Sequence, residues 1–375
     1  MASDTLSHAR ASAGTGSAAA RSRDPFLDNA KFLLIVLVVI GHSWGPLEDE
    51  IRAVKAGYLL VYAFHMPAFA LLCGHLARSF TGRPDQIRKL VSNVLVPYLI
   101  FETLYAGMYA VVWDQPFSIT PTEPRYLTWF LLALFLWRLT VPLWRALRHP
   151  VAVAALVSVA AGITGMGYDL ALPRVLMFLP WFVLGLRLRR EQFAPLRTRG
   201  ARWLAVPVLL CAGAGAYWAA PRTSGGWLLM QWSGADMGVP AATYVLMRLA
   251  LFGLAAVLMC AFLALVPGRA TVYTALGAVT LYPYLMHGLF VKTVEGSGGY
   301  DVIAAGGLPV AALLTVLAGV LAVVLSSAPV RRVAWPLVEP RLPRWLWSPA
   351  DAQSHGPPRP PEPQQPLKST GVNSP

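Results

Sequence analysis

Three histidines and one lysine lie inside long apolar runs of this sequence, and they are the first candidates for chemistry. Lys31 precedes His42 by eleven residues in one run, His65 follows Phe64 in a second run, and His287 lies in a third. Imidazole, whose ordinary pKa is about 6.5, accepts or donates a proton near neutral pH, and an ammonium group holds an anion. These residues therefore predict a site for proton transfer to or from a ligand.

The spacing of Lys31 and His42 puts both side chains on one side of a helix. Eleven residues complete about three turns at 3.6 residues per turn, so the two side chains share a face roughly 16 Å apart along the axis. A single helix would then present a cation near one end and a base near the other.

The composition requires a membrane around these residues. Of 375 residues, 56% are hydrophobic and 13% are charged, with a mean hydropathy of +0.53, and these values exclude a soluble enzyme. Because a helix needs about 20 residues to cross a bilayer, we predict an all-α polytopic membrane protein of about ten transmembrane helices. The expected spans are residues 29–47, 58–77, 92–113, 126–144, 151–167, 171–187, 203–220, 243–266, 272–293 and 303–326.

Lys and Arg are concentrated in the loops after the even-numbered spans, so the positive-inside rule predicts that both termini are cytoplasmic. The net charge of +13 then reflects topology and attraction to anionic lipid, not nucleic acid. We expect a multi-pass protein of the cell membrane with the lipid bilayer as its partner. No helix-dimerisation motif dominates, so no oligomeric state is predicted. Arg138 is close enough to the cytoplasmic end of the fourth span to snorkel to the interface.

In this topology, the three histidines lie at a similar depth, roughly 7–10 Å below the external surface at about 1.5 Å per residue. A single intramembrane histidine is often only a hydrogen bond between helices, but three at one depth favour a polar cavity. No two of them have a metal-ligand spacing and no carboxylate adjoins them, so no metal is predicted. Glu102, in the third span, is interpreted either as a proton acceptor or as a partner of Lys31 or Arg248.

The two ends of the chain differ from its centre. Residues 1–24 are rich in Ala, Ser, Gly and Arg, and residues 351–375 contain seven prolines. We predict disordered tails at 1–24 and 331–375, the second basic and then Pro-rich, on either side of a membrane domain at 25–330. The cysteines Cys73, Cys211 and Cys260 lie in apolar runs without disulfide or metal spacing and are interpreted as packing residues.

Several segments together resemble the integral-membrane acyltransferase 3 family over about residues 25–330. The Lys31-x10-His42 spacing matches the family's Arg/Lys-x10-His signature, and Phe64-His65-Met66-Pro67 with Gly74 matches its second-span motif. Cys73 departs from that motif, because many members have Ser before the glycine. Within the family the sequence is most similar to the fucose 4-O-acetylase branch. Further matches are Arg88 to Tyr98, Trp129 to Leu134, Arg174 to Gly185 and Leu281 to His287.

The resemblance implies an O-acetyltransferase that moves an acetyl or other acyl group from cytosolic acetyl-CoA to a hydroxyl of a cell-surface or exported carbohydrate or a related acceptor. His42 is the leading candidate for the base, because a sugar hydroxyl is a poor nucleophile at neutral pH. The other candidate catalytic residues are Lys31, His65, His287 and Glu102. The expected residues for the phosphates of coenzyme A are Arg83, Arg88, Lys89 and Lys31, and those for the acceptor are Trp129, Arg174 and Tyr282.

Two other functions remain open on the sequence alone. A transporter or flippase for a polar or lipid-linked compound would use the histidines as a proton relay. The absence of paired Gly/Pro-broken helices in matching halves of the sequence argues against this function. A structural membrane scaffold is a weaker alternative, because it has no need of Lys31, His42, His65, Glu102 and His287 in apolar surroundings.

Overall fold

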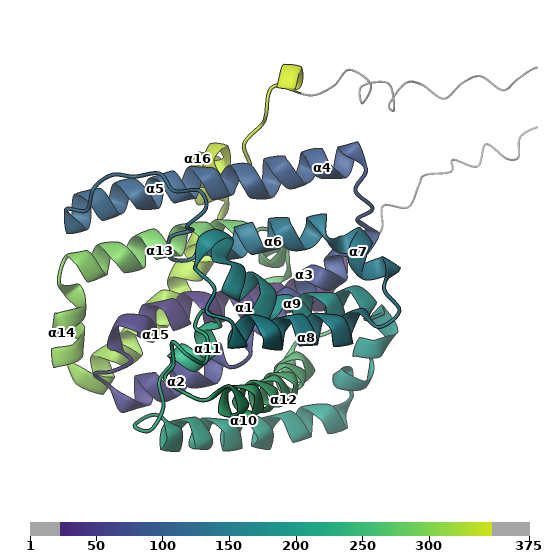
Figure 1. Cartoon of the computed structure of the whole chain (residues 1–375). Coiled ribbons are helices and arrows are strands. Elements are labelled where there is room, and N and C mark those ends of the chain that lie inside the picture. Colours follow the sequence, from purple (N-terminus) through teal and green to yellow (C-terminus); the bar gives the residue numbers. More distant parts are fainter. Residues whose placement is uncertain (1–22, 347–375) are drawn as a thin grey trace, which may run out of the picture.

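Helices make up all the regular structure in residues 23–346, the part of the chain that the computed structural model describes (Figure 1). The prediction of an all-α fold is confirmed. The α-helices are α1 (Pro25–Trp44), α2 (Arg52–Tyr62), α3 (His65–Leu76), α4 (Pro84–Leu90), α5 (Val96–Trp113), α6 (Trp129–Leu139), α7 (Val141–Ala146), α8 (Pro150–Ile163), α9 (Leu172–Arg187), α10 (Arg199–Ala219), α11 (Gly226–Leu229), α12 (Ala241–Leu265), α13 (Leu281–Gly296), α14 (Gly299–Ala305), α15 (Gly307–Leu325) and α16 (Ala328–Val338).

Seven helical segments within residues 23–346 are long and apolar enough to cross a membrane, where the sequence predicts about ten spans. The three predicted spans that do not reach this length, 126–144, 151–167 and 272–293, contain the shorter helices α6, α8 and α13. The seven segments are Pro25–Leu47, Arg52–Ser79, Pro84–Trp113, Asp169–Arg187, Arg199–Ala219, Ala241–Leu265 and Gly307–Leu325.

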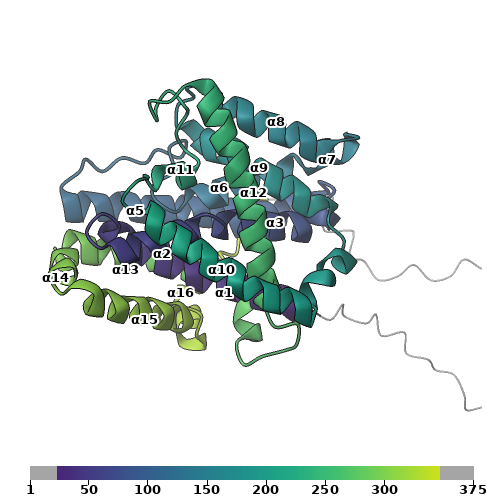
Figure 2. The same ribbon diagram turned by 90° about the horizontal axis from the view of Figure 1, so that it is seen from below.

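Large apolar side chains are exposed on the outer helices. Only 6% of the membrane-spanning stretch of α10 is buried. Exposed side chains on the outer helices include Leu204 and Leu210 of α10, Val257 of α12 and Val316 of α15. Figure 2 shows α10 and α12 crossing each other at one side of the bundle and α15 at another. An exposed apolar surface of this extent needs lipid around it, which agrees with a polytopic membrane protein.

Helix α1 packs against α2, α3, α13 and α15, so it is surrounded by other helices for much of its length. Its first turn is attached to the segment before α13 through Asn29, which is fully buried. The Asn29 amide donates to the carbonyls of Pro267 at 2.8 Å and Arg269 at 2.9 Å. Its oxygen accepts from the hydroxyls of Thr271 and Thr274. These bonds use all of the amide's polar capacity and hold α1 at a defined position along its axis.

The second predicted span is broken between α2 and α3, directly before His65. Pro67 lies in the first turn of α3, where its missing N–H is tolerated and its ring favours a helix start. The break leaves the carbonyl of Val61 available, and the His65 ring nitrogen Nδ1 hydrogen-bonds it at 2.8 Å. This bond sets the orientation of the His65 ring, and the same carbonyl also accepts from the backbone N–H of Phe64 at 3.2 Å.

Helices α3 and α9 pack more closely than any other pair of helices in residues 23–346. Two glycines allow this approach. A Cβ atom on Gly74 would lie 2.0 Å from the carbonyl oxygen of Phe182, and one on Gly185 would lie 2.0 Å from that of Leu71. Small residues permit such backbone contact between membrane helices. Gly74 and Gly185 belong to the motifs that the sequence matches, and their packing gives a physical reason for them.

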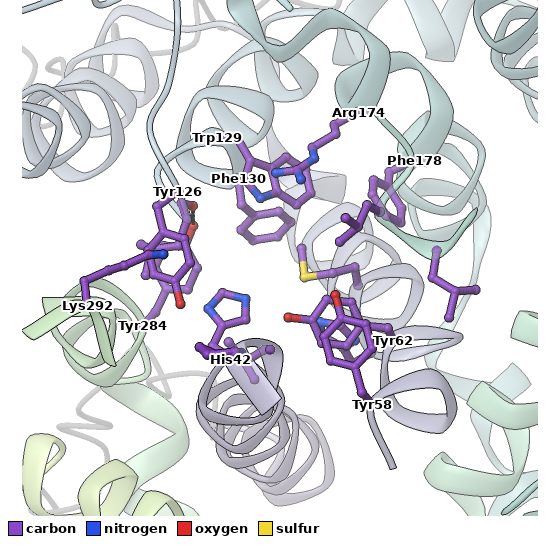
Figure 3. Close-up of a pocket in the computed structure, with 18 of the residues that line it drawn as sticks. His42, Tyr58, Tyr62, Tyr126, Trp129, Phe130, Arg174, Phe178, Tyr284 and Lys292 are labelled. Carbon is purple, nitrogen blue, oxygen red and sulfur yellow. Dashed lines mark hydrogen bonds between the residues drawn. The ribbon is translucent and has the colours of Figure 1, made fainter. Parts of the chain in front are cut away.

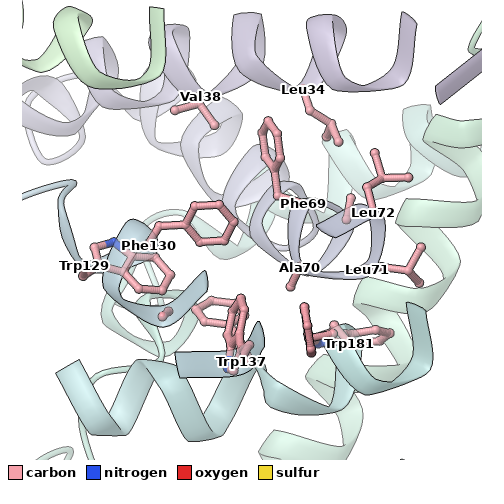
Figure 4. Close-up of a cluster of buried hydrophobic side chains, with 14 of the residues drawn as sticks. Leu34, Val38, Phe69, Ala70, Leu71, Leu72, Trp129, Phe130, Trp137 and Trp181 are labelled. Carbon is pink, nitrogen blue, oxygen red and sulfur yellow. The ribbon is translucent and has the colours of Figure 1, made fainter. Parts of the chain in front are cut away.

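An aromatic core connects α3, α6 and α9 (Figure 4). Trp129 stacks on Phe178 with ring centres 5.6 Å apart, and Trp137 stacks on Phe182 at 5.3 Å. The Trp137 indole N–H donates to the carbonyl of Val175 at 2.8 Å, so this buried ring has its polar group satisfied. The core fixes α6, whose first residues face the polar interior described below.

The predicted tails fall at the limits of the described residues. Residues 1–22 of the predicted N-terminal tail lie outside them. Helix α16 extends to Val338, so the first residues of the predicted C-terminal tail, 331–375, are helical. Residues 347–375 of that tail lie outside the described residues.

Candidate active site

Two cavities lie along α1, one near each end. The His42 cavity has a volume of about 350 Å³ and is lined by His42, His65 and Arg174 among others. The Lys31 cavity has a volume of about 310 Å³ and is lined by Lys31, Cys73 and Arg138 among others. Both are also lined by the same four side chains, which therefore lie between them: Val38, Met66, Phe130 and Tyr284. The predicted placement of Lys31 and His42 on one face of α1 is confirmed.

His42 and His287 are hydrogen-bonded to each other, Nδ1 of His42 lying 3.0 Å from Nε2 of His287. The Nδ1 atom of His287 lies 2.7 Å from the carbonyl of Pro283, which only accepts. Neutral His287 therefore has its proton on Nδ1 and accepts at Nε2. His42 must then donate from Nδ1, and its Nε2 becomes the unprotonated nitrogen. Because His42 lines the cavity, this lone pair is available to a ligand (Figure 3).

His65 is the third histidine at this cavity. Its Nδ1 faces the Val61 carbonyl and therefore carries the proton, and its buried Nε2 has no hydrogen-bond partner in the described part of the chain. Its ring packs edge-on against Tyr62, with ring centres 4.6 Å apart. The predicted gathering of three histidines is confirmed, although His287 lies behind His42 and does not line the cavity. The lone pair of His42 Nε2 is thus open to hydroxyl groups in the cavity, whereas Nε2 of His65 is enclosed beside it.

Glu102 does not line either cavity. Its fully buried carboxylate accepts from the Arg125 guanidinium at 2.7 Å, the Arg125 backbone N–H at 2.9 Å and the Thr128 hydroxyl at 2.8 Å. The predicted alternatives of Lys31 or Arg248 as its partner are therefore wrong. Arg125 lies in the loop between α5 and α6. The sequence alone does not show that this loop folds back to bring Arg125 to Glu102. The carboxylate holds the turn from which Tyr126 projects into the His42 cavity.

Two charged residues that the sequence prediction did not include also line the His42 cavity. Lys292 forms an ion pair with Glu295 at 2.7 Å, and its ammonium lies 4.8 Å from the centre of the Tyr126 ring. They lie in the last turns of α13, beyond His287. Figure 3 shows Lys292, Tyr126 and Tyr284 on one side of His42. The lining therefore contains an ammonium that is already neutralised by a carboxylate.

Trp129 and Arg174, two of the expected acceptor residues, both line the His42 cavity. The Arg174 guanidinium lies 4.9 Å from the centre of the Trp129 ring and donates to the side-chain oxygen of Gln231. The third expected residue, Tyr282, lines neither cavity. Tyr284 lies between the cavities instead. Side chains two positions apart on a helix point about 200° away from each other, so Tyr282 and Tyr284 face nearly opposite directions.

Of the four basic residues expected to bind the phosphates of coenzyme A, one lines the Lys31 cavity. Lys31 lines the Lys31 cavity, and Asp28 holds its ammonium at 2.8 Å. Arg83 pairs with Asp85 at the surface, Lys89 is exposed, and neither they nor Arg88 lines the cavity. Arg88 and Lys89 lie in the short helix α4, and Arg83 precedes it. Arg138 of α6, expected to snorkel away, lines the cavity instead.

A comparison with protein-family models shows which family the chain belongs to. An acyltransferase domain model of the acyltransferase 3 type matches residues 24–331, most of the chain. The chain belongs to the acyltransferase 3 family. It is thus a multi-pass membrane acyltransferase, as the sequence predicts. No curated protein and no solved structure matches the chain. Within residues 23–346, no group of three or more His, Cys, Asp or Glu side chains is placed to hold a metal ion.

Proposed function

We propose that this acyltransferase moves an acetyl or similar acyl group from cytosolic acetyl-CoA to a hydroxyl of a cell-surface or exported carbohydrate or related acceptor. The observation that carries the proposal is the His42–His287 hydrogen bond, which leaves the Nε2 lone pair of His42 facing the His42 cavity. A general base placed at a hydroxyl is what acyl transfer to a sugar requires.

In the proposed reaction, His42 Nε2 accepts the proton of the acceptor hydroxyl as its oxygen attacks the thioester carbonyl. The positive charge of Arg174, on the lining of the same cavity, favours the developing oxyanion. The carbon–sulfur bond then breaks, and the proton passes from His42 to the leaving thiolate. The products are an ester of the acceptor and free coenzyme A, and His42 is restored.

The two cavities support entry of the substrates from opposite ends of α1. The Lys31 end is the predicted cytoplasmic end, and the donor thioester would approach from it past Val38, Met66, Phe130 and Tyr284. The acceptor would occupy the His42 cavity, with one of its hydroxyls at Nε2 of His42. Acyl transfer would thus cross the membrane while coenzyme A stays on its own side.

The experiment that tests the function uses purified full-length protein in detergent with radiolabelled acetyl-CoA. We expect thioester turnover and acetyl-CoA binding in the wild type, and binding without turnover in His42→Ala. Surface glycans and small metabolites from cells with and without the gene would then differ by one acetyl group. A transporter or flippase would bind no acetyl-CoA, and that result would refute the proposal.

A further inference from the structure

Arg138 is the one basic side chain on the lining of the Lys31 cavity that has no partner in the described part of the chain. It lies near the end of α6, its Nε is enclosed by protein, and no hydrogen bond or ion pair to it is formed within residues 23–346. A snorkelling arginine directs its guanidinium to the lipid headgroups. Arg138 is half-buried with only its Nε enclosed, so the end of its guanidinium stays accessible on the cavity lining.

The charges around the Lys31 cavity are not balanced. Asp28 is shared between Lys31 at 2.8 Å and Arg23 at 3.1 Å, so one carboxylate faces two cations. No Asp or Glu is found among the residues that line the cavity, which contribute Lys31 and Arg138. Two cations on a cavity wall without a carboxylate on the same lining favour an anionic ligand.

The cavity also has the right position for one particular anion. Its lining passes from Lys31 and Arg138 to the four side chains that border the His42 cavity, and Lys31 and His42 lie roughly 16 Å apart along α1. The pantetheine arm of coenzyme A is a flexible chain of similar reach, with the thioester at one end and a diphosphate at the other. A guanidinium binds phosphate oxygens through two parallel hydrogen bonds.

We propose that Arg138 and Lys31 together form the subsite for the diphosphate at the base of the donor's pantetheine arm. This inference rests on the proposed function, and it replaces Arg83, Arg88 and Lys89 as the residues nearest to that group. Arg138 binds the diphosphate by its planar guanidinium, and Lys31 adds a second charge from α1. The thioester then reaches the side chains between the two cavities.

The test compares Arg138→Gln, Arg138→Lys and the control Arg148→Gln, which removes an exposed arginine of the loop between α7 and α8. The donors are acetyl-CoA and S-acetylpantetheine, which lacks the phosphates. For Arg138→Gln we expect the KM for acetyl-CoA to rise roughly 10- to 100-fold, the loss of a charged hydrogen bond, with kcat within about twofold. Its KM for S-acetylpantetheine should equal that of the wild type. Arg138→Lys should recover part of the loss, and Arg148→Gln should match the wild type.

The subsite would be overturned if Arg138→Gln changed the KM values for acetyl-CoA and S-acetylpantetheine equally, or changed neither of them. An effect of Arg148→Gln as large as that of Arg138→Gln would also overturn it, in favour of general surface attraction. Calorimetric binding of free coenzyme A and of pantetheine separates this inference from the proposed function. If no variant or wild type transfers acetyl groups but Arg138→Gln still weakens coenzyme A binding at least tenfold, the subsite stands and the proposed function fails. If Arg138→Gln binds coenzyme A as tightly as the wild type, Arg138 does not form a diphosphate subsite.

Discussion

The two histidines of the bonded pair have different roles because of where each proton lies. His287 is fixed by the Pro283 carbonyl and only accepts from His42, whereas His42 is left with its lone pair towards the cavity. A neutral, oriented imidazole is the form that can act as a base. In the proposed reaction His287 would position His42 without touching the substrate, because it does not line the His42 cavity.

This assignment predicts a difference between kcat and KM. In His287→Ala, His42 loses the acceptor that selects its tautomer, so we expect kcat to fall roughly 10- to 1,000-fold. The KM for acetyl-CoA should stay within about threefold, because His287 lines neither cavity. Steady-state kinetics over a range of pH measures both. The matched control is His149→Ala, an exposed loop histidine, and a kcat loss of the same size there would contradict the assignment.

Glu102 gives the second prediction at the residue scale. Its carboxylate accepts three hydrogen bonds from Arg125 and Thr128 and holds the turn that carries Tyr126. Removing one partner of a buried pair costs about 3–5 kcal/mol, so Glu102→Ala should lower the melting temperature of the purified protein. Glu102→Gln keeps the shape and some of the hydrogen bonds, so it should be destabilised less and retain measurable activity. Glu102→Gln protein of wild-type stability but without any turnover would instead indicate a role in catalysis.

At the scale of elements, the interface of α3 and α9 brings the broken second span to the site. Gly74 and Gly185 let the two backbones touch, and the break before His65 orients its ring towards the Val61 carbonyl beside the cavity. The segment that carries the histidine is thereby fixed from two directions. Helix α6, held by the aromatic core, contributes Trp129 and Phe130 to the same region.

The close contact predicts that Gly74→Ala is destabilising, because the added methyl group would overlap the Phe182 carbonyl. Overpacking costs about 1–3 kcal/mol or more, and here the obstacle is backbone. Thermal unfolding in detergent and the yield of folded protein measure the effect. Gly253→Ala in α12 is the control, since its new Cβ meets nothing within 4 Å. Equal melting temperatures for the two variants would show that α3 and α9 are not so closely packed.

At the scale of the whole molecule, the cavities at opposite ends of α1 predict a sided reaction. In sealed inside-out vesicles, acetyl-CoA added outside reaches the cytoplasmic face, and we expect acetyl transfer only to an acceptor enclosed in the lumen. Right-side-out vesicles with external acceptor should need acetyl-CoA inside. Radiolabel in the acceptor fraction measures transfer, and detergent permeabilisation serves as the control. Transfer to an acceptor supplied only on the cytoplasmic face would disprove the sided arrangement.

Much of this protein follows from local patterns in its sequence. Apolar runs of membrane length predict the all-α fold because each helix satisfies its own backbone hydrogen bonds within the bilayer. The period of a helix puts Lys31 and His42 on one face, and span direction brings His42, His65 and His287 to one depth. The matched motifs indicate the family. None of these inferences requires knowing which helices are neighbours.

Only the tertiary structure decided the partners across helices. Arg125 pairs with Glu102, His42 bonds to His287 245 positions away, and Arg138 turns into a cavity where snorkelling was expected. The first outcome depends on how the loop between α5 and α6 folds back over α5, and the other two depend on the rotation and contact of one helix against another. That packing arises from side-chain shape and close glycine contacts, such as Gly74 against α9, and not from periodicity along one chain segment. Helical periodicity therefore defines the faces, while packing determines which faces meet and so which residues form the site.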